Sequence, residues 1–231
     1  MRFEIGPGFF VLVAVGLGVL AAWSWQQDQK RLERLRLWAL KRGWRAWPGG
    51  EGGPLYEHPG LSLLDRGHSR RCDCLVRGRS GEGEGAQALD LFDYRYVTGH
   101  GKNRTTHRYA VAILTLPFPV KGLRLRPENA LDKVGEFLGA EDIDFESAEF
   151  SRRFFVSAND RKWAYDVIHA RMMEFLLAAP AGWSLEMGSR EIAAYRAGRA
   201  EPSTYEEAIA LLEGVRDRIP EYVIRQQRGE D

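Results

Sequence analysis

Two cysteines preceded by two histidines are the residues of this chain best suited by type to bind a metal. Cys72 and Cys74 stand one residue apart, and His68 and His58 come shortly before them. Zinc prefers thiolate and imidazole ligands, but its paired cysteines are usually separated by about two to four residues. Alternate residues of a strand point to one face, so we expect both thiols on the same face of a sheet. Two small buried strand residues are the favoured interpretation, and Cys72, Cys74 and His68 remain weak metal candidates.

A second set of possible ligands consists of carboxylates that alternate along one segment. Asp142, Asp144 and Glu146 would share a strand face. Carboxylate oxygens bind calcium, but a calcium loop also needs a glycine in its middle and a bidentate acid at its end. Ser147 and Arg153 stand at those two positions, so this template fails. A solvated strand face is the favoured interpretation, and the sequence predicts no bound metal and no cofactor.

The segment over 99–103 has some features of a phosphate-binding loop. Gly101, Lys102 and Asn103 resemble the end of such a loop, but the earlier glycine is missing and Asn replaces Ser or Thr. The segment also joins two predicted strands, whereas a phosphate loop opens a helix. We therefore predict a hairpin loop, whose basic residues Lys102 and Arg104 are candidates for contact with lipid headgroups or an acidic partner.

The histidines show no spacing typical of a nucleophile and its base. His169 and Asp166 fall within one helical turn, and a surface pair is the favoured interpretation of them. Catalytic triads are assembled by the fold and not by spacing, so sequence alone excludes none. The enzymatic alternative is a membrane-bound hydrolase or metal-dependent enzyme that uses Asp142, Asp144 and His169.

An apolar segment at the amino terminus is expected to position the rest of the chain. No charged residue lies between Glu4 and Asp28, and a helix of that length spans the roughly 30 Å of a bilayer core. We expect an extracytoplasmic tip over 1–5 and a transmembrane helix over 6–25. A signal peptide cleaved near 22–24 and a buried core helix are the alternatives.

Basic residues are concentrated after this segment. Because Lys and Arg are retained on the cytoplasmic side, we expect a single-pass protein of the inner (cytoplasmic) membrane with its C-terminal domain in the cytoplasm. The helix is expected to continue as a basic juxtamembrane helix over 26–47, which packs Leu37, Leu40, Trp44 and Trp47 on that domain. The alternative function of this helix is contact with anionic lipid or a partner. The basic residues assigned to that contact are Arg34, Arg36, Lys41 and Arg42.

The remainder predicts one soluble α+β domain over 55–224, with an antiparallel sheet and flanking helices, and a polar tail over 225–231. Runs of alternating residues predict a meander of three strands in its first half. The expected strands are 61–64, 71–77, 89–97, 106–116, 122–126, 144–157, 183–187 and 191–195. The expected helices are 129–138, 160–179 in one or two pieces, and 203–218 with Ser203 as its cap and Glu206 completing a capping box.

The acidic and aromatic run over 144–156, DFESAEFSRRFFV, is continued by Asn159-Asp160 and by a helix that contains Met172-Met173-Glu174. This pattern resembles a bacterial family of membrane-anchored proteins that is classed as a domain of unknown function (DUF3137-like). The resemblance extends loosely over 89–179. It implies a membrane-anchored architecture, although members often carry two spans where this chain has one, and it carries over no catalytic residue.

The functional prediction rests on composition and on the lack of residues whose spacing indicates a catalytic site. Basic and acidic residues nearly balance, with a net charge of +1, so nothing indicates a nucleic-acid partner. We expect a membrane-anchored, cytoplasmic, non-enzymatic module that binds a protein or lipid partner. The expected partners are the membrane, a protein, or a second copy of the chain associating through its glycine-bearing anchor.

Overall fold

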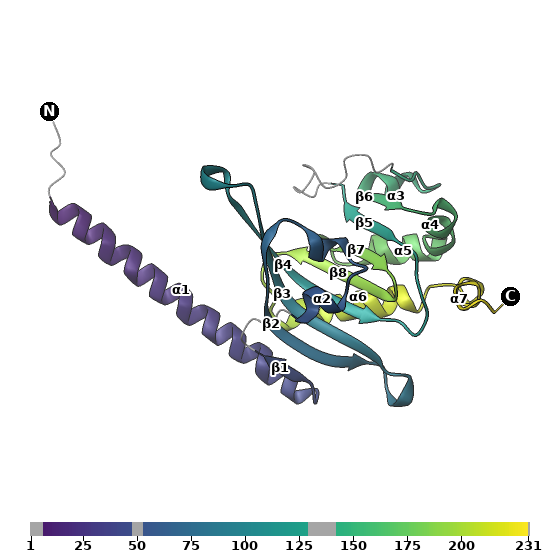
Figure 1. The fold of residues 1–231 in the computed structure, drawn as a ribbon, viewed down its shortest axis with the longest axis horizontal. Coiled ribbons are helices and arrows are strands. Elements are labelled where there is room, and N and C mark those ends of the chain that lie inside the picture. The colour runs from purple at the N-terminus through teal and green to yellow at the C-terminus, as the bar shows by residue number, and fades with distance from the viewer. Residues whose placement is uncertain (1–6, 48–52, 129–141, 231) are drawn as a thin grey trace.

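The computed structural model describes residues 7–47, 53–128 and 142–230, which form an antiparallel sheet with helices on both faces (Figure 1). The expected helix over 129–138 lies outside these residues. The helices are α1 (Pro7–Lys41), α2 (Gly53–Glu57), α3 (Ala148–Arg153), α4 (Arg161–Val167), α5 (Ala170–Ala178), α6 (Pro202–Arg216) and α7 (Glu221–Arg228). The strands are β1 (Arg45–Trp47), β2 (His68–Ser80), β3 (Gln87–Thr98), β4 (Thr105–Thr115), β5 (Leu123–Pro127), β6 (Phe154–Ala158), β7 (Ser184–Gly188) and β8 (Glu191–Ala197).

The sheet has eight strands in the order β1-β2-β3-β4-β8-β7-β5-β6, and all neighbouring pairs are antiparallel. The predicted meander is present as β2, β3 and β4, and the predicted final hairpin as β7 and β8. In β4, Ala110 and Ala112 pack on one face of the sheet, while Val111 and Ile113 pack on the other. A strand that is apolar on both faces belongs in the middle of a sheet, which is where β4 lies.

Two apolar clusters cover the two faces of the sheet. The larger cluster lies under α6 and the second half of α1, and includes Leu35 and Leu212. The smaller cluster lies under α2 and a short 3-10 helix, η1 (Ser62–Asp65), and includes Phe92. The strand expected over 61–64 is wrong, because η1 occupies that segment and turns its leucines onto the sheet.

The helix expected to continue past residue 25 does so. α1 is unbroken from Pro7 to Lys41, so the basic segment from 26 onward extends the apolar one. Gly43 then adopts a left-handed conformation, with φ of +71°, which is a common way to end a helix. The chain reverses there into β1, which pairs with β2, so the expected helix does not reach Trp47.

The buried face of α1 is also different from the predicted one. Leu37 and Leu40 are half exposed or more, at 50% and 56%. Arg31, Leu35 and Ala39 are buried instead, spaced four residues apart on one helix face. A charged residue in the buried stripe is the reason why apolar periodicity selected the wrong face.

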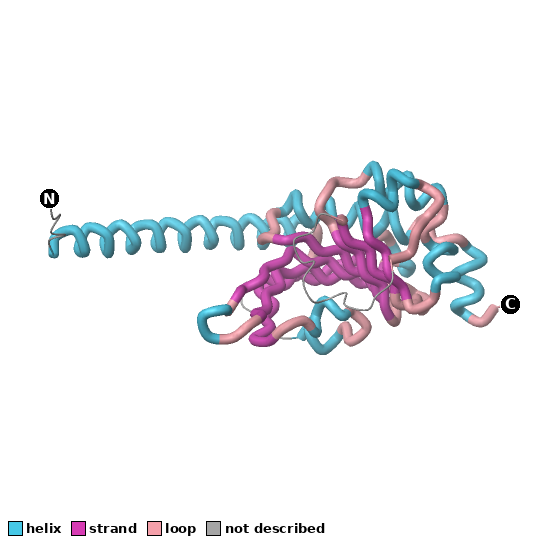
Figure 2. Tube along the Cα trace, turned by 90° about the horizontal axis from the view of Figure 1, so that it is seen from above, coloured by secondary structure: helices cyan, strands magenta, loops and turns pink. Residues whose placement is uncertain are grey.

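Among the residues that the structure describes, none of the helices has the length and apolar composition that crossing a membrane requires. The transmembrane helix expected over 6–25 is therefore wrong, and so is the expected single-pass location in the inner membrane with a cytoplasmic C-terminal domain. The apolar segment and the charged segment from Asp28 onward belong to one helix, whose charged half packs on the sheet. The first half of α1 projects away from the sheet (Figures 1 and 2), with exposed side chains from Val15 to Trp25.

The segment 144–157, expected to be a strand or a bent strand pair, contains a helix followed by a strand. The Ser147 hydroxyl accepts a hydrogen bond from the Phe150 amide and caps the start of α3. Phe150 and Phe154 are four residues apart and pack with ring centroids 5.1 Å from each other. This spacing is one helical turn, but it is also compatible with the alternation of a strand, so the pattern was ambiguous.

The helices of the C-terminal half otherwise lie where the sequence predicts them, and the differences are at their ends. The helix predicted over 160–179 is present in two pieces, α4 and α5. The predicted cap of α6 is wrong, because Glu201 and Thr204 form the capping box and Ser203 lies inside the helix. The polar tail over 225–231 is helical at its start, since α7 extends into it.

Candidate ligand-binding pocket

The structure separates the two cysteines that were metal candidates. Cys72 lies in the cluster under α2, and Cys74 lies in the cluster under α6, on the opposite face of the sheet. The pairing of β2 with β3 shifts between Asp73 and Val76, and Cys74 has a φ of +54°. A β-bulge inserts a residue and changes the side-chain alternation, so the prediction of a shared face is wrong. Burial raises the pKa of each thiol to about 12, which leaves both protonated at neutral pH.

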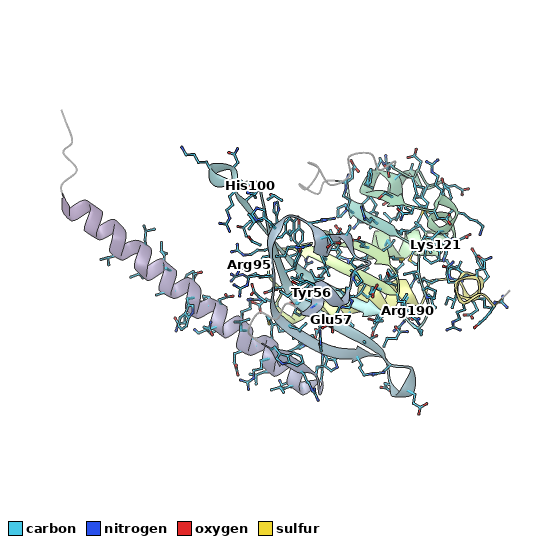
Figure 3. All side chains as sticks on the ribbon, in the orientation of Figure 1. Tyr56, Glu57, Arg95, His100, Lys121 and Arg190 are labelled. Carbon is cyan, nitrogen blue, oxygen red and sulfur yellow. The ribbon has the colours of Figure 1, made fainter. Side chains whose placement is uncertain are left out.

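The third metal candidate belongs to the β3–β4 hairpin. His68 contacts the Gly99 carbonyl oxygen through Nε2, at 3.0 Å, and its ring stacks on His100 with centroids 4.9 Å apart. His100 marks the outer end of the hairpin, away from the sheet (Figure 3). Lys102 and Arg104 are exposed at the same tip. The predicted basic hairpin loop is therefore present, and His68 makes its contacts with this loop.

Two of the four basic candidates on α1 attach this helix to α6. Arg34 forms a two-pronged contact with Glu201, through Nε–Oε2 at 3.2 Å and Nη2–Oε1 at 2.8 Å. Arg42 is paired with Glu206 at 3.0 Å. Because these side chains hold one element of the domain on another, their charges are already neutralised within the chain. The two remaining candidates on this helix, both exposed, are Arg36 and Lys41.

The three residues of the enzymatic alternative make separate contacts. Asp142 accepts a hydrogen bond from the Val156 amide at 3.0 Å, and Asp144 is exposed on a segment that is not a strand. His169 precedes α5, and its Nε2 lies 2.9 Å from the Arg218 carbonyl oxygen. Among the described residues, no hydrogen bond or ion pair joins any two of the three.

An apolar cavity of about 860 Å³ lies where the β7–β8 hairpin meets α3, α5 and α6. Its floor consists of buried leucines from four different elements: Leu125 of β5, Leu176 of α5, Leu185 of β7 and Leu211 of α6. The volume falls within the range of about 300–1,000 Å³ that small-molecule sites usually have. The cavity is therefore large enough for a ligand with a long apolar part.

The mouth of this cavity carries an excess of positive charge. Arg108, on β4, and Arg152, on α3, are exposed lining residues with no ion-pair partner in the described part of the chain. Glu149, one turn before Arg152, is the only acid among the described lining residues. Two unpartnered guanidinium groups above an apolar floor can hold an anionic group whose apolar part enters the cavity.

Internal contacts fix the walls around the mouth. Arg196 is paired with Glu207 at 2.8 Å, and its guanidinium carbon lies 4.6 Å from the centre of the Trp183 ring. This group ties β8 and the start of β7 to α6. On the other side, Arg153 donates a hydrogen bond to the Leu177 carbonyl oxygen at 2.6 Å and holds the end of α5. The cavity is therefore preformed by elements that are joined to one another.

Sequence analysis did not identify this cavity. Its floor residues are far apart in the chain, from Leu125 to Leu211, and each has the apolar character of an ordinary core position. The one local signal was the turn over 180–182, Pro-Ala-Gly, whose small residues form one side of the mouth. It indicated only the end of a helix, because its partners across the mouth come from other elements.

Comparisons with known proteins give one structural likeness. No family model matches the sequence, and no curated protein matches it. A matching solved structure is the crystal structure of the mycobacterial trehalose monomycolate transport factor A, TtfA, with a TM-score of 0.59 and 13% sequence identity. The match covers 80% of this chain and 92% of that one. At this identity the likeness concerns the fold, so the chain is similar in its fold to that mycobacterial transport factor.

Proposed function

We propose that this chain is a non-enzymatic binding domain whose cavity takes an amphipathic ligand, one with an apolar chain and an anionic group. The observation that carries this proposal is the cavity of about 860 Å³ with buried leucines at its floor and two unpartnered arginines at its mouth. Such a ligand belongs to the lipid class among the partners that the sequence left open.

The apolar floor provides most of the affinity. Each methylene group that leaves water on binding contributes about 0.8 kcal/mol, so the cavity favours ligands with a long chain over small polar ones. Leu176 and Leu185 are 3% exposed each and lie on joined elements, α5 and β7. A preformed floor of this kind loses little conformational freedom when the ligand enters.

The arginines at the mouth select the ligand head. An exposed ion pair is worth at most about 1 kcal/mol, so Arg108 and Arg152 discriminate an anionic head from a neutral one without dominating the affinity. Arg108 comes from β4 and Arg152 from α3, so two separate elements contribute positive charge to the lining. The head group therefore remains near solvent, while the chain is enclosed.

The positions of the candidate catalytic residues support a binding role. Asp142 and His169 each bind a backbone group of their own surroundings, and neither lines the cavity. A binding domain needs no nucleophile or base near its ligand, whereas an enzyme does. The proposal therefore keeps the non-enzymatic class that the sequence favoured.

The family resemblance is part of this proposal. The segment over 144–156 that resembles the DUF3137-like family forms α3 and the start of β6, and Arg152 and Phe154 of this segment line the cavity. In this proposal, the motif forms part of one wall of a ligand site.

The test compares two ligands that differ only in the head group, dodecanoic acid and dodecanol, by titration calorimetry. We expect the full chain to bind the acid about tenfold more tightly than the alcohol, which corresponds to about 1.4 kcal/mol. The double variant Arg108→Gln/Arg152→Gln should lose this preference and keep its affinity for the alcohol. Ala197→Trp changes an exposed lining position. The larger side chain should fill the cavity and weaken the binding of both ligands.

Arg104→Gln is the matched control, because Arg104 is exposed at the distant hairpin tip and its loss should change neither affinity. Binding of neither ligand, or binding that Ala197→Trp leaves unchanged, contradicts the proposal. If Arg104→Gln loses the preference for the acid as fully as the double variant does, the selectivity comes from the overall charge of the protein. Arg108 and Arg152 then have no special role in selecting the ligand.

A further inference from the structure

A compact group of ionisable side chains lies on the other side of the sheet from the cavity floor, next to α2. Glu57 ends α2, His58 follows it, and Asp90 on β3 lies beneath them. Glu191, at the start of β8, completes the group behind the imidazole. Figure 3 labels Glu57, which shows where this group lies at the end of α2, over the face of the sheet.

The distances in this group are close to those of a metal site. One possible ligand atom each from Glu57, His58 and Asp90 lies within 4.8 Å of the others. The shortest of these separations that involves the imidazole is 3.3 Å, from His58 Nε2 to Asp90 Oδ2. In a tetrahedral site with bonds of about 2.0 Å, neighbouring ligand atoms are about 3.3 Å apart. Two of the three ligands therefore already have the required separation.

Glu57 is the ligand that has to move, and it exchanges its ion pair with Arg77 for the metal ion. Its side chain is 48% exposed, whereas those of His58 and Asp90 are 9% and 13% exposed. A small rotation of an exposed carboxylate toward a fixed, buried pair is enough to close the site. The exposed position of Glu57 also leaves a path from solvent for an ion.

His58 is held as metal-binding histidines usually are. Its Nε2 faces Asp90, and its Nδ1 lies 3.7 Å from Glu191 Oε1. The Nδ1 atom is buried and has no hydrogen-bond partner in the described part of the chain. Metal-binding histidines commonly present their second nitrogen to a carboxylate, which orients the ring and strengthens it as a ligand. Nδ1 of His58, the ring nitrogen that faces Glu191, is thus placed to donate to this carboxylate when Nε2 binds an ion.

We propose that Glu57, His58 Nε2 and Asp90 bind a divalent transition-metal ion, with Glu191 as the partner that orients the imidazole. One imidazole and two carboxylates are a ligand set that suits Zn²⁺ or Mn²⁺. Water fills the remaining coordination positions, because among the described residues the possible ligands at this place are Glu57, His58 and Asp90 alone.

The charges of the group agree with a divalent occupant. The carboxylates of Glu57, Asp90 and Glu191 outnumber the one permanent cation, Arg77, which lies 3.4 Å from Asp90 and also contacts Glu57. This excess of carboxylates over permanent cations favours a divalent cation as the occupant.

The experiment titrates the chelator-treated full chain with Zn²⁺, Mn²⁺ and, for comparison, Mg²⁺ by calorimetry. We expect one Zn²⁺ or Mn²⁺ ion per chain and at least tenfold weaker binding of Mg²⁺. Glu57→Gln is the deciding variant, because Glu57 is half exposed and its loss leaves the buried pair intact. It should weaken Zn²⁺ binding at least tenfold, as should His58→Gln. Absorption of bound Co²⁺ should report a site containing nitrogen and oxygen ligands, and Glu57→Gln should change this spectrum.

His100→Gln is the matched control, because it removes one ring of the stacked His68–His100 pair, where two imidazoles lie close together. Zn²⁺ binding should survive this change. Failure to bind Zn²⁺ or Mn²⁺ overturns the proposal, as does an affinity that Glu57→Gln leaves unaltered. Binding that is lost in His100→Gln and kept in Glu57→Gln places the ion at the hairpin tip and equally overturns it.

Discussion

Arg31 of α1 forms a buried ion pair with Asp93 of β3, with Nη1 and Oδ2 2.7 Å apart and both side chains 10% exposed. The guanidinium also donates a hydrogen bond to the Ala200 carbonyl oxygen, and Asp93 accepts one from the Ala200 amide. Burial raises the pKa of Asp93, and the charge of Arg31 acts against this rise. This contact is one of those that join the second half of α1 to the sheet and to the start of α6.

The first prediction concerns this pair. Arg31→Met leaves the Asp93 carboxylate buried without its counter-charge, and losses of this kind lower the free energy of unfolding by about 3–5 kcal/mol. Arg34→Gln removes an exposed pair with Glu201 and should lower it by less than about 1 kcal/mol. Urea denaturation of both variants measures the difference. Equal losses in the two variants would mean that Arg31 is not a principal contact of α1.

The second prediction is a pH dependence of stability that arises from His58. Burial lowers its pKa, but the hydrogen bond to Asp90 and the negative charges of Asp90 and Glu191 outweigh this effect and raise the pKa from 6.5 to about 9. A raised pKa stabilises the fold fully below the unfolded value of about 6.5, and this contribution disappears as the pH rises through about 9. With chelator present, the free energy of unfolding should fall by up to about 3 kcal/mol over that interval. The fall should be absent in His58→Gln; if it persists there, another group is responsible.

The third prediction contrasts two buried tyrosines. Tyr205 is fully buried, and within the described residues its hydroxyl has no hydrogen-bond partner. Tyr94 is equally buried, but its hydroxyl donates to the Leu64 carbonyl oxygen. Since an unpaired buried hydroxyl destabilises by about 1–3 kcal/mol, Tyr205→Phe should raise the melting temperature, and Tyr94→Phe should lower it. Thermal denaturation by circular dichroism distinguishes them, and a loss of stability in Tyr205→Phe contradicts the prediction.

The fourth prediction concerns two helical glycines in opposite surroundings. A Cβ at Gly214 in α6 would lie 2.1 Å from Cζ of Phe175, whereas a Cβ at Gly16 in α1 would have nothing within 4 Å. Alanine favours a helix over glycine by about 1 kcal/mol, but overpacking usually costs about 1–3 kcal/mol. Gly214→Ala should therefore destabilise the chain, and Gly16→Ala should not. Chemical denaturation checks both, and a stabilising Gly214→Ala would show that Phe175 can move aside.

Local patterns predicted those elements whose shape depends on neighbouring residues alone. Alternation along 106–116 was enough to predict β4 and its central place in the sheet. Apolar residues on both faces of a strand require that both faces be covered, which happens in the middle of a sheet. The helix over 160–179 followed from apolar periodicity and from Asp160, which caps α4 by accepting a hydrogen bond from the Trp163 amide. In these cases the short-range preference and the tertiary packing agree.

Other errors arose where one pattern allowed two structures. The spacing of Phe150 and Phe154 suits a helical turn and a strand equally well, and the contact of α3 with the neighbouring elements selected the helix. In β2, a single bulge placed Cys72 and Cys74 on opposite faces. No local residue preference predicts a bulge at a cysteine, because its position depends on the register with β3.

The sequence by itself determined that this chain forms an antiparallel meander followed by helices and a hairpin, since side-chain periodicity and turn residues act over a few positions. Only the tertiary structure decided that Arg31 is buried, that Glu57, His58 and Asp90 meet, and that leucines from four elements enclose a cavity. Each of these arrangements depends on residues tens of positions apart. The free energy that brings them together comes from packing and charge pairing across the sheet, which no short stretch of sequence contains.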